Sequence, residues 1–249
     1  MPSLQTYDSS LEYSYTPGVF PSLECLKKRP DKVRRLLVHS QSGKNEGVRT
    51  LIALCDELHI RVEEADKALS RISGKDNCYA AAVFDKFQGT LHQDSPHIVL
   101  HHPSDAGNLG TILRTALGFF MTNIAIIRPA ADVFDPKVIR ASMGALFSME
   151  VMLFDTIEKY LELYPGHSLY PFMLDGSCPL QEAVKAHESP YALVFGNEGS
   201  GLPASFAQMG QAVRIPHSGS IDSLNLSIAA AIGMYAFHSW EESLCMMKS

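Results

Sequence analysis

The chain has 249 residues, of which 46% are hydrophobic and 19% are charged, and its formal net charge is −6. This length fits one large domain or two smaller ones, and the apolar fraction is sufficient for an ordinary globular core. No apolar run is long enough to span a bilayer and the first residues lack the features of a signal peptide, so we expect a cytoplasmic protein with no membrane partner.

The first part of the chain shows a short alternation of strand and helix patterns. Such an alternation predicts a small α/β domain over residues 1–90, followed by a linker at 91–96 in a polar stretch with Gly and Pro. The predicted strands lie at 34–40, 59–65 and 78–84, and the predicted helices lie near 45–57 and 66–72.

The basic residues of the chain are concentrated in this first part. Residues 1–100 hold 13 basic and 13 acidic side chains, whereas residues 101–249 hold 8 basic and 14 acidic ones. The densest cluster is KKRPDKVRR at 27–35, with six positive residues in nine. If the protein binds a polyanion, we expect contact here; the alternative is a solvated face of a helix and loop.

From residue 97 onward, short apolar strands alternate with helices. This order predicts a parallel sheet covered by helices on both faces, in a domain that spans 97–249. The predicted strands lie at 97–103, 123–129, 151–155, 169–175, 191–197 and 212–217, and the helices at 107–120, from about 136, near 156–164, near 179–187 and from about 223.

The residues after each strand are candidates for a site, because ligands bind beyond the carboxyl ends of strands in open parallel sheets. The first candidate stretch is SDAGNLGTILRTALGFF at 104–120. Asn108 and Gly110 stand at the predicted helix start, with Arg114 about one turn further in. These residues suit an anionic group such as phosphate; a glycine turn with a solvent-facing arginine is the alternative.

The second candidate stretch is GNEGSGLP at 196–203, which has three glycines and one carboxylate, Glu198. Glycines at 196, 199 and 201 allow the backbone to approach a ligand closely. The stretch is not the dinucleotide fingerprint G-x-G-x-x-G, which disfavours a nucleotide-dependent oxidoreductase. A loop with a carboxylate suits a neutral or cationic ligand, and a tight surface loop is the alternative.

The third candidate stretch is SGSIDSLNLSIAAAIGMY at 218–235, at the start of the last predicted helix. Ser223 or Asp222 can cap that helix. A cap at either position leaves Asn225 unexplained, because it would then be the second or third residue of an alanine-rich helix. An amide there indicates a further role.

Two other features of the sequence weigh against a metal site and against disulfide bonds. His101 and His102 end a predicted strand, but no third ligand is spaced to join them, so we expect no metal. The five cysteines are scattered without a C-x-x-C pair, which predicts reduced thiols.

Taken together and in this order, the three stretches resemble the three motifs of the SpoU/TrmH branch of the SPOUT RNA methyltransferases. The segment VIRASMGALFSM at 138–149 resembles the sequence between those motifs, and the likeness covers about residues 97–240. Residues 11–90 resemble, more by pattern than by motif, a small ribosomal-protein-like substrate-binding domain. The resemblance implies a parallel α/β domain with a deep trefoil knot that pairs into a homodimer.

The activity implied by the resemblance is methyl transfer from S-adenosylmethionine to a ribose 2′-hydroxyl of rRNA or tRNA, with no action on DNA. An inactive RNA-binding protein of the same fold is the alternative. A guanidinium hardly ever loses its proton, so we expect the motif arginine to hold a phosphate and the nascent alkoxide rather than to act as the base. The implied catalytic residues are Arg114, Asn108, Glu198, Ser223 and Asn225, and the implied cofactor-binding residues are Gly196, Ile215, Leu224, Leu174 and Asn225.

The chain departs from the family pattern at two positions. Phe120 stands where the family usually has glycine, and His217 stands where it often has an apolar residue. Neither position belongs to the motif residues, so we expect an effect on the shape of the pocket rather than on activity.

Overall fold

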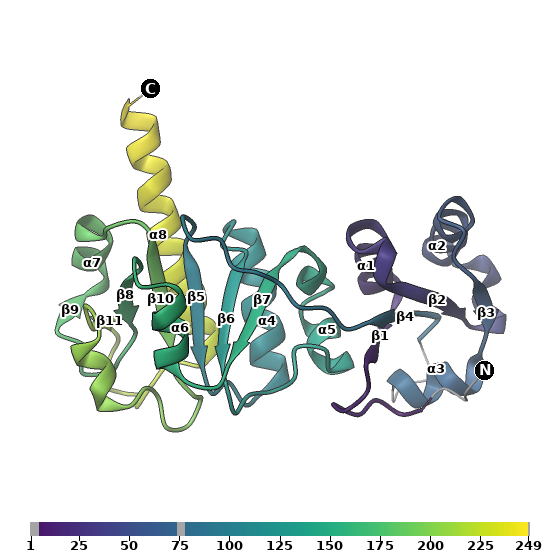
Figure 1. Cartoon of the computed structure of the whole chain (residues 1–249), viewed down its shortest axis with the longest axis horizontal. Coiled ribbons are helices and arrows are strands. Elements are labelled where there is room, and N and C mark those ends of the chain that lie inside the picture. Colours follow the sequence, from purple (N-terminus) through teal and green to yellow (C-terminus); the bar gives the residue numbers. More distant parts are fainter. Residues whose placement is uncertain (1–4, 74–77, 249) are drawn as a thin grey trace. The chain divides into compact units, whose positions relative to one another are not determined.

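The structure is a computed structural model that describes residues 5–73 and 78–248, without the side chains of 247 and 248 (Figure 1). The chain forms two compact units. Unit 1 consists of Met1–Phe87 and Asp132–Ser148, and unit 2 consists of Gln88–Ala131 and Met149–Ser249. Across the described residues, no helix combines the length and the apolar character that crossing a bilayer requires.

Unit 1 contains a four-stranded mixed sheet with the strand order β1-β4-β2-β3. Strands β1 and β2 are antiparallel to β4, and β3 is parallel to β2. The elements of the first stretch of unit 1 are β1 (Tyr13–Pro17), α1 (Val19–Lys28), η1 (Pro30–Lys32), β2 (Val33–Val38), η2 (Ser40–Lys44), α2 (Glu46–Glu57), β3 (Val62–Glu64), α3 (Asp66–Ser73) and β4 (Ala80–Asp85).

Alternation along the strands of unit 1 builds a core on each face of its sheet. Leu36 and Ala82 pack with Val48 and Leu51 of α2 on one face. Their neighbours Leu37 and Ala81 belong to a second cluster, which includes Leu69 of α3. Successive side chains of a strand point to opposite faces, so both faces of this sheet are covered. The sequence analysis did not anticipate β1 or α1, whose residues mix aromatic, polar and apolar types.

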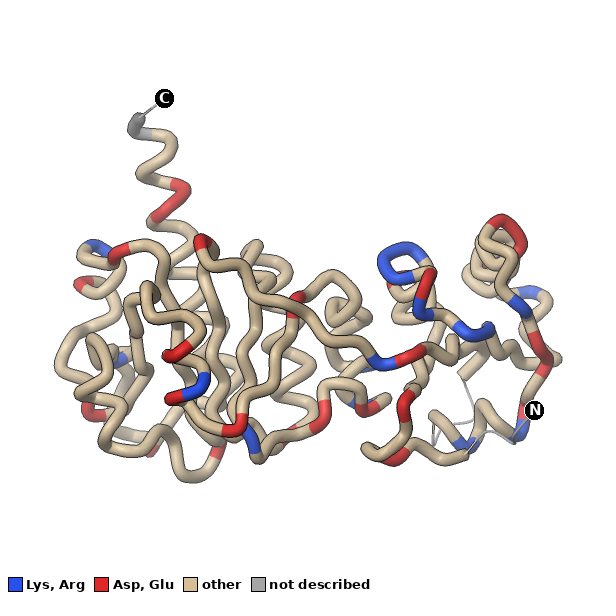
Figure 2. The backbone as a smooth tube through the Cα atoms, viewed as in Figure 1, with Lys and Arg blue, Asp and Glu red and all other residues tan. Residues whose placement is uncertain are grey.

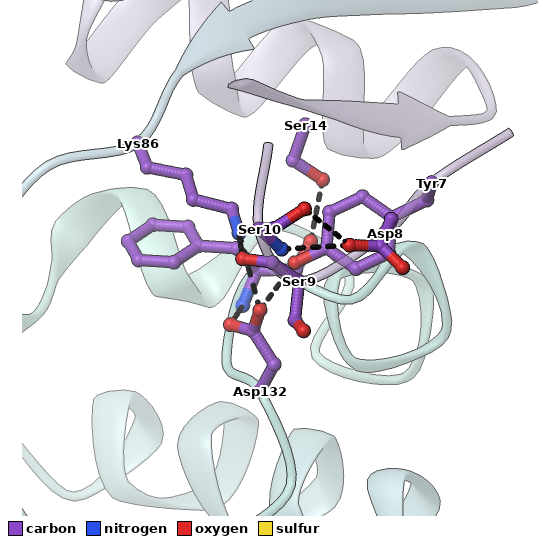
Figure 3. Close-up of polar contacts among 8 residues, drawn as sticks. Tyr7, Asp8, Ser9, Ser10, Ser14, Lys86 and Asp132 are labelled. Carbon is purple, nitrogen blue, oxygen red and sulfur yellow. Dashed lines mark hydrogen bonds and ion pairs between the residues drawn. The ribbon is translucent and has the colours of Figure 1, made fainter. Parts of the chain in front are cut away.

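A segment from the second half of the sequence completes unit 1. It carries α5 (Pro136–Ala141) and η3 (Ala145–Ser148). Figure 3 shows its attachment: Asp132 accepts a hydrogen bond from the Tyr7 hydroxyl and pairs with Lys86 at 3.2 Å, and the Ser14 hydroxyl donates to the carbonyl of Phe134 at 2.5 Å. The ammonium of Lys86 also lies 4.9 Å from the centre of the Tyr7 ring.

The compact units therefore divide the chain differently from the predicted boundary at 91–96. Residues 132–148 pack with unit 1, although they follow the boundary by some forty residues. Residues 88–96 pack with unit 2, because Leu91 joins its core. As domains with separate functions, 1–90 and 97–249 remain a prediction.

Unit 2 contains a five-stranded parallel sheet with the order β7-β6-β5-β10-β8, which confirms the predicted parallel α/β class (Figure 1). A small parallel pair, β9 and β11, lies apart from this sheet. The elements of unit 2 are β5 (His97–His101), α4 (Ala106–Gly118), β6 (Asn123–Ile127), β7 (Glu150–Phe154), α6 (Ile157–Leu163), β8 (Ser168–Pro171), β9 (Cys178–Pro179), α7 (Leu180–Ala186), β10 (Tyr191–Phe195), η4 (Ala204–Gln208), β11 (Val213–Arg214) and α8 (Leu226–Lys248).

The central strands of unit 2 are buried on both faces, as parallel strands usually are. Val99 and Val194 pack with Ile157 and Tyr160 of α6 in one cluster. Their strand neighbours, such as Leu100, are also fully buried and point the opposite way. The last predicted strand, 212–217, is shorter than expected, because residues after Arg214 leave the ladder and form a loop.

Candidate functional site

A cavity of about 400 Å³ lies beyond the carboxyl ends of β8 and β10. Three loops and the first turns of α8 form its walls, and each loop follows a strand of unit 2. The residues that line it are Phe172, Met173, Leu174, Asp175, Phe195, Gly196, Asn197, Glu198, Gly199, Ser200, Gly201, Leu202, Val213, Ile215, His217, Ser223, Leu224, Leu226 and Ala229.

The loop after β10 is a tight turn in which two positions require glycine. Asn197 and Gly201 exchange backbone hydrogen bonds of 3.2 and 3.0 Å, and Gly201 has a φ of +68°. A Cβ at Gly196 would lie 2.3 Å from the carbonyl carbon of Gly201 and 2.4 Å from the nitrogen of Leu202. Oδ1 of Asn197 accepts hydrogen bonds from the backbone amides of Gly199 and Ser200, at 2.9 and 3.1 Å. The backbone of this loop is therefore held close against the cavity.

Glu198 connects this loop to the loop after β5. Its carboxylate accepts hydrogen bonds from the amide and hydroxyl of Ser104, at 3.0 and 2.8 Å, and from the amide of Asp105 at 3.0 Å. Burial alone would raise the pKa of Glu198, but these hydrogen bonds outweigh it and hold the pKa below its usual range. The side chain is thus a charged clamp that also lines the cavity.

Two amides extend this clamp to the start of α8. The Nδ2 group of Asn108 donates to Glu198 at 3.4 Å, and the Nδ2 group of Asn225 donates to Oδ1 of Asn108 at 3.1 Å. The other end of the Asn225 side chain accepts from the amide and hydroxyl of Ser227, at 2.9 and 2.7 Å. One asparagine therefore caps α8 and joins it to α4.

This geometry corrects the prediction about the start of the last helix and identifies the cap of α4. The last helix begins at Leu226 rather than near 223, and its capping side chain is Asn225 rather than Ser223 or Asp222. The cap of α4 is Asp105, whose carboxylate accepts from the amide of Asn108 at 2.7 Å. An asparagine or aspartate just outside the first turn satisfies amides that have no partner within the helix.

Six of the predicted site residues line the cavity. They are Leu174, Gly196, Glu198, Ile215, Ser223 and Leu224. Asn108 and Asn225 do not line it but belong to the hydrogen-bonded chain behind Glu198.

Arg114 is separate from this group. It is exposed, lies about 9 Å further along α4 than Asn108, and has no hydrogen bond or ion pair to any described residue. Within one chain, the structure does not bring its guanidinium to the cavity.

Several residues of the site were not anticipated from the sequence. Phe172 and Phe195 stack with ring centres 4.5 Å apart and form part of the cavity wall. Ser104 is the first residue of the first candidate stretch and could have been found from that position. The structure also locates the two residues that depart from the family pattern. His217 lines the cavity, and Phe120 has a φ of +58°, a conformation that favours glycine.

The predicted basic stretch lies in unit 1, at the end of α1 and on η1 and β2 (Figure 2). Lys27 and Lys28 are exposed at the last turn of α1, with no hydrogen bond or ion pair to a described residue. The three arginines of the stretch are engaged within unit 1: Arg29 lies over the ring of Phe87, Arg34 pairs with Asp85 and Arg35 pairs with Glu63.

The chemical character of the cavity suits S-adenosylmethionine. Its walls are apolar side chains and glycine-rich backbone, which suit a neutral heterocycle. Its charged lining includes the Glu198 and Asp175 carboxylates, and no described lysine or arginine lines it. A sulfonium cation is therefore favoured there over an anionic group such as a pyrophosphate.

Comparison with known proteins agrees with this reading of the cavity. The model of the SpoU rRNA Methylase family matches residues 95–235. The chain is 27% identical over 210 residues to the 23S rRNA (guanosine(2553)-2′-O)-methyltransferase RlmP of Bacillus subtilis, covering 84% of this chain and 82% of that protein. It is 28% identical over 153 residues to the 23S rRNA (uridine(2479)-2′-O)-methyltransferase of Streptomyces viridochromogenes, covering 58% of this chain and 53% of that protein.

A solved structure shows the same fold over nearly the whole chain. The AdoMet-bound rRNA methyltransferase from Sinorhizobium meliloti superposes with a TM-score of 0.78 at 25% identity, covering 92% of this chain and 87% of that chain. The family model spans all three of the glycine- and asparagine-bearing stretches whose loops form the cavity and its hydrogen-bonded support. The chain belongs to the SpoU rRNA methylase family.

Proposed function

We propose that this protein transfers a methyl group from S-adenosylmethionine to a ribose 2′-hydroxyl of rRNA or tRNA. The names of the relatives above support the reaction and the class of substrate. The observation that carries the proposal is the convergence of three separate loops on one cavity, with the Glu198 carboxylate joining one of them to the loop after β5.

Bound S-adenosylmethionine supplies an electrophilic methyl group, which passes to the ribose 2′-oxygen as the carbon–sulfur bond breaks and the hydroxyl proton is released to water. The chain must therefore orient two reactants in line and stabilise charge on the oxygen. Gly196, Ile215, Leu224 and Leu174 hold the cofactor, mainly through the close approach of backbone and apolar contact.

The polar residues of the motifs keep this arrangement in shape and receive the RNA. Glu198, Asn108 and Asn225 fix the relative positions of the loops that bear them, and Ser223 contributes a hydroxyl at the cavity. Arg114 is exposed and unpaired among the described residues, which leaves it available to hold an RNA phosphate. Because it lies apart from the cavity of its own chain, its proposed contact with the developing alkoxide would be made at the cavity of a second copy.

The knot and the homodimer belong to the same proposal. The chain after β10 returns beside the chain after β8, where Val213 bridges to Phe172, and this proximity supports a threaded loop. Large apolar side chains remain exposed on α8 and just after α4, which supports a second copy covering them. These side chains are Phe120, Ile228 and Tyr235, at 78, 51 and 60% exposure.

Unit 1 is proposed to hold RNA away from the reacting ribose. Its exposed cations, Lys27 and Lys28, support this role. We further propose that the protein acts in the cytoplasm. We also propose that it acts on RNA and not on DNA, because the 2′-hydroxyl that would be methylated exists only in RNA.

The reaction is tested by tritium transfer from labelled S-adenosylmethionine to unmodified rRNA and tRNA transcripts. We expect incorporation into one of them, none into DNA, and a loss of about 100-fold with Arg114→Ala at unchanged cofactor binding by calorimetry. Lys185→Ala, an exposed cation on α7, is the control and should retain full activity.

The same experiment separates the alternative. An inactive RNA-binding protein would retain transcripts on a filter without transferring label, and its cavity would have no need to bind the cofactor. Cofactor binding without transfer to any transcript would contradict the proposed reaction.

A further inference from the structure

A second cavity, of about 230 Å³, lies beyond the carboxyl ends of β5, β6 and β7. It shares no lining residue with the cofactor cavity. Its walls come from the ends of these strands, the start of α6 and the η4 turn. The lining residues are His101, His102, Ile127, Asp155, Thr156, Ile157, Glu158, Pro203, Ser205, Phe206 and Met209.

A buried polar atom without a partner lies in the wall of the cavity. His101 is 9% exposed, and its Nδ1 atom has no hydrogen bond to any described residue. Burial, and then the neighbouring His102, lowers the pKa of His101, so its ring is neutral near pH 7. A buried polar atom left unpaired is unfavourable, so a small turn of the ring that brings Nδ1 to a ligand atom in the cavity is favoured.

The remaining walls suit a flat ring. The His101 and His102 rings stack with centres 3.7 Å apart, and the Phe206 ring meets His101 edge-on at 5.0 Å. Ile127 and Met209 add apolar surface. Aromatic and apolar walls with a few hydrogen-bonding groups are the usual setting in which proteins bind an unstacked nucleobase.

The polar groups of the lining decide between classes of ligand. Asp155 and Glu158 place two exposed carboxylates in the lining, and Asp155 is paired with Arg128 at 3.3 Å, which leaves Glu158 as the carboxylate without a cation among the described residues. Thr156 and Ser205 add hydroxyls. Carboxylates repel a phosphate and accept hydrogen bonds from an amino group. No group of three His, Cys, Asp or Glu side chains suited to a metal ion occurs among the described residues. An amino-bearing base is therefore favoured over an anion or a metal ion.

The second cavity is linked to the cofactor cavity through the loop after β10, in which Leu202 lines one cavity and Pro203 the other, and through a hydrogen bond. The Nδ2 group of Asn197, which lines the cofactor cavity, donates to the carbonyl of His102 at 2.9 Å. An RNA strand that presents a ribose to the cofactor would therefore have its bases close to both openings.

We propose that this second cavity binds a base of the RNA substrate that carries an exocyclic amino group, namely adenine, cytosine or guanine, and so selects the methylated nucleotide or its neighbour. This inference rests on the proposed function, which supplies RNA as the substrate. Nδ1 of His101 pairs with the edge of the base, and the carboxylates of Asp155 and Glu158 accept from its amino group.

Binding is tested directly through the histidine ring signals in NMR spectra, assigned with His101→Phe. The protein is saturated with S-adenosylhomocysteine, which blocks the cofactor cavity, and titrated with millimolar AMP, CMP, GMP, UMP or ribose 5-phosphate. We expect the His101 signal to move with the three amino-bearing nucleotides, less with UMP and not with ribose 5-phosphate. No movement, or equal movement with ribose 5-phosphate, would overturn the inference.

The contribution to catalysis is tested on the transcript that the wild-type protein methylates. His101→Phe retains a ring and removes Nδ1, and Glu158→Gln retains shape and removes charge. We expect each to lower kcat/KM for RNA about tenfold, the equivalent of one good hydrogen bond, with unchanged cofactor affinity. Glu162→Gln, on the same helix but paired with Lys159 at 3.0 Å, is the control and should stay within twofold of wild type.

A third measurement ties the loss to the base itself. Replacing the amino-bearing base near the methylated ribose by an analogue without the amino group should slow wild type but not slow Glu158→Gln further. Additive losses, or a loss of cofactor affinity in His101→Phe, would overturn the inference. If wild type methylates no transcript, the proposed function fails, while the nucleotide titration still decides what the cavity binds.

Discussion

Strand β5 has a histidine at each end, and the two have different surroundings. At its amino end, His97 is fully buried and stacks on His167 with ring centres 3.9 Å apart. Both of its ring nitrogens are paired, Nε2 with the carbonyl of His92 and Nδ1 with the hydroxyl of Tyr160, each at 2.9 Å. At its carboxyl end, His101 stacks on its neighbour in much the same way, but its Nδ1 has no described partner.

The difference follows from the direction of the sheet. In a parallel sheet the chain leaves every strand at the same edge, so loops that can diverge gather there and enclose cavities. The cofactor cavity and the second cavity both lie at that edge of unit 2. The opposite edge is filled by the packed rings of His97, Tyr160 and Tyr164. Changes at the carboxyl edge should therefore alter binding, and changes at the amino edge should alter stability.

The largest effect at the carboxyl edge is expected for Gly196→Ala. The new methyl group would lie within 2.4 Å of two backbone atoms of the same turn, so the turn must move away from the cofactor. We expect cofactor affinity by calorimetry to fall at least about 100-fold. Gly166→Ala is the control, because a Cβ there would meet nothing within 4 Å and the residue does not line the cavity. Equal affinities of the two variants would show that this edge tolerates displacement.

A pH titration tests the amino edge. Burial, and then repulsion from His167, lowers the pKa of His97 from 6.5 to about 4. The unfolded chain therefore takes up this proton first, so the contribution to stability is complete above pH 6.5 and is lost as the pH falls toward 4. The difference in pKa corresponds to about 3 kcal/mol in the free energy of unfolding.

Urea unfolding at pH 7 and pH 4.5 measures this loss. His97→Phe should reduce the difference between the two pH values more than His101→Phe does, because His101 is the less strongly perturbed of the two. The reverse order would contradict the division between the two edges.

Glu198→Gln should have the next largest effect, on binding rather than on folding. An amide oxygen retains some of the hydrogen bonds from Ser104 and Asp105, but the charge that strengthens them is gone. We expect cofactor affinity and the rate of methyl transfer to fall about 30-fold, or about 2 kcal/mol. Glu182→Gln, an exposed carboxylate on α7, should leave both unchanged.

The smallest effect is expected at Asn225, where two roles can be separated. Asn225→Asp retains the oxygen that caps α8 and loses the amide that donates to Asn108, so it should weaken transfer with little change in melting temperature. Asn225→Ala loses both and should also cost about 1 kcal/mol of stability. Thermal melting with single-turnover transfer distinguishes them. Identical melting of both variants and wild type would mean that the cap is unimportant.

Much of unit 2 could be predicted from local patterns. The apolar runs that became β5, β6 and β10 are buried on both faces, so each forms a continuous hydrophobic stretch in the sequence. The glycines at 196 and 201 are required by the turn itself, whatever its surroundings. Six predicted site residues line the cavity for this reason: the motif residues lie in or beside the loops that form it.

Other features could not be predicted because they depend on partners distant in the sequence. Residues 132–148 join unit 1 through contacts of Asp132 with Tyr7 and Lys86, more than forty residues away (Figure 3). Asn225 is recognisable as a polar residue near a helix start, but its bond to Asn108 spans 117 positions.

The sequence by itself determined the family, the parallel α/β class of the second half and most of the loop residues that line the larger cavity, because strand burial, tight turns and motif order are local properties. Only the tertiary structure decided which arginines of the basic stretch are engaged, which residue caps α8, and that His101 lines a cavity while His97 is enclosed. Those outcomes depend on which side chains the fold brings together, and two histidines four residues apart on one strand carry no local signal of their different surroundings.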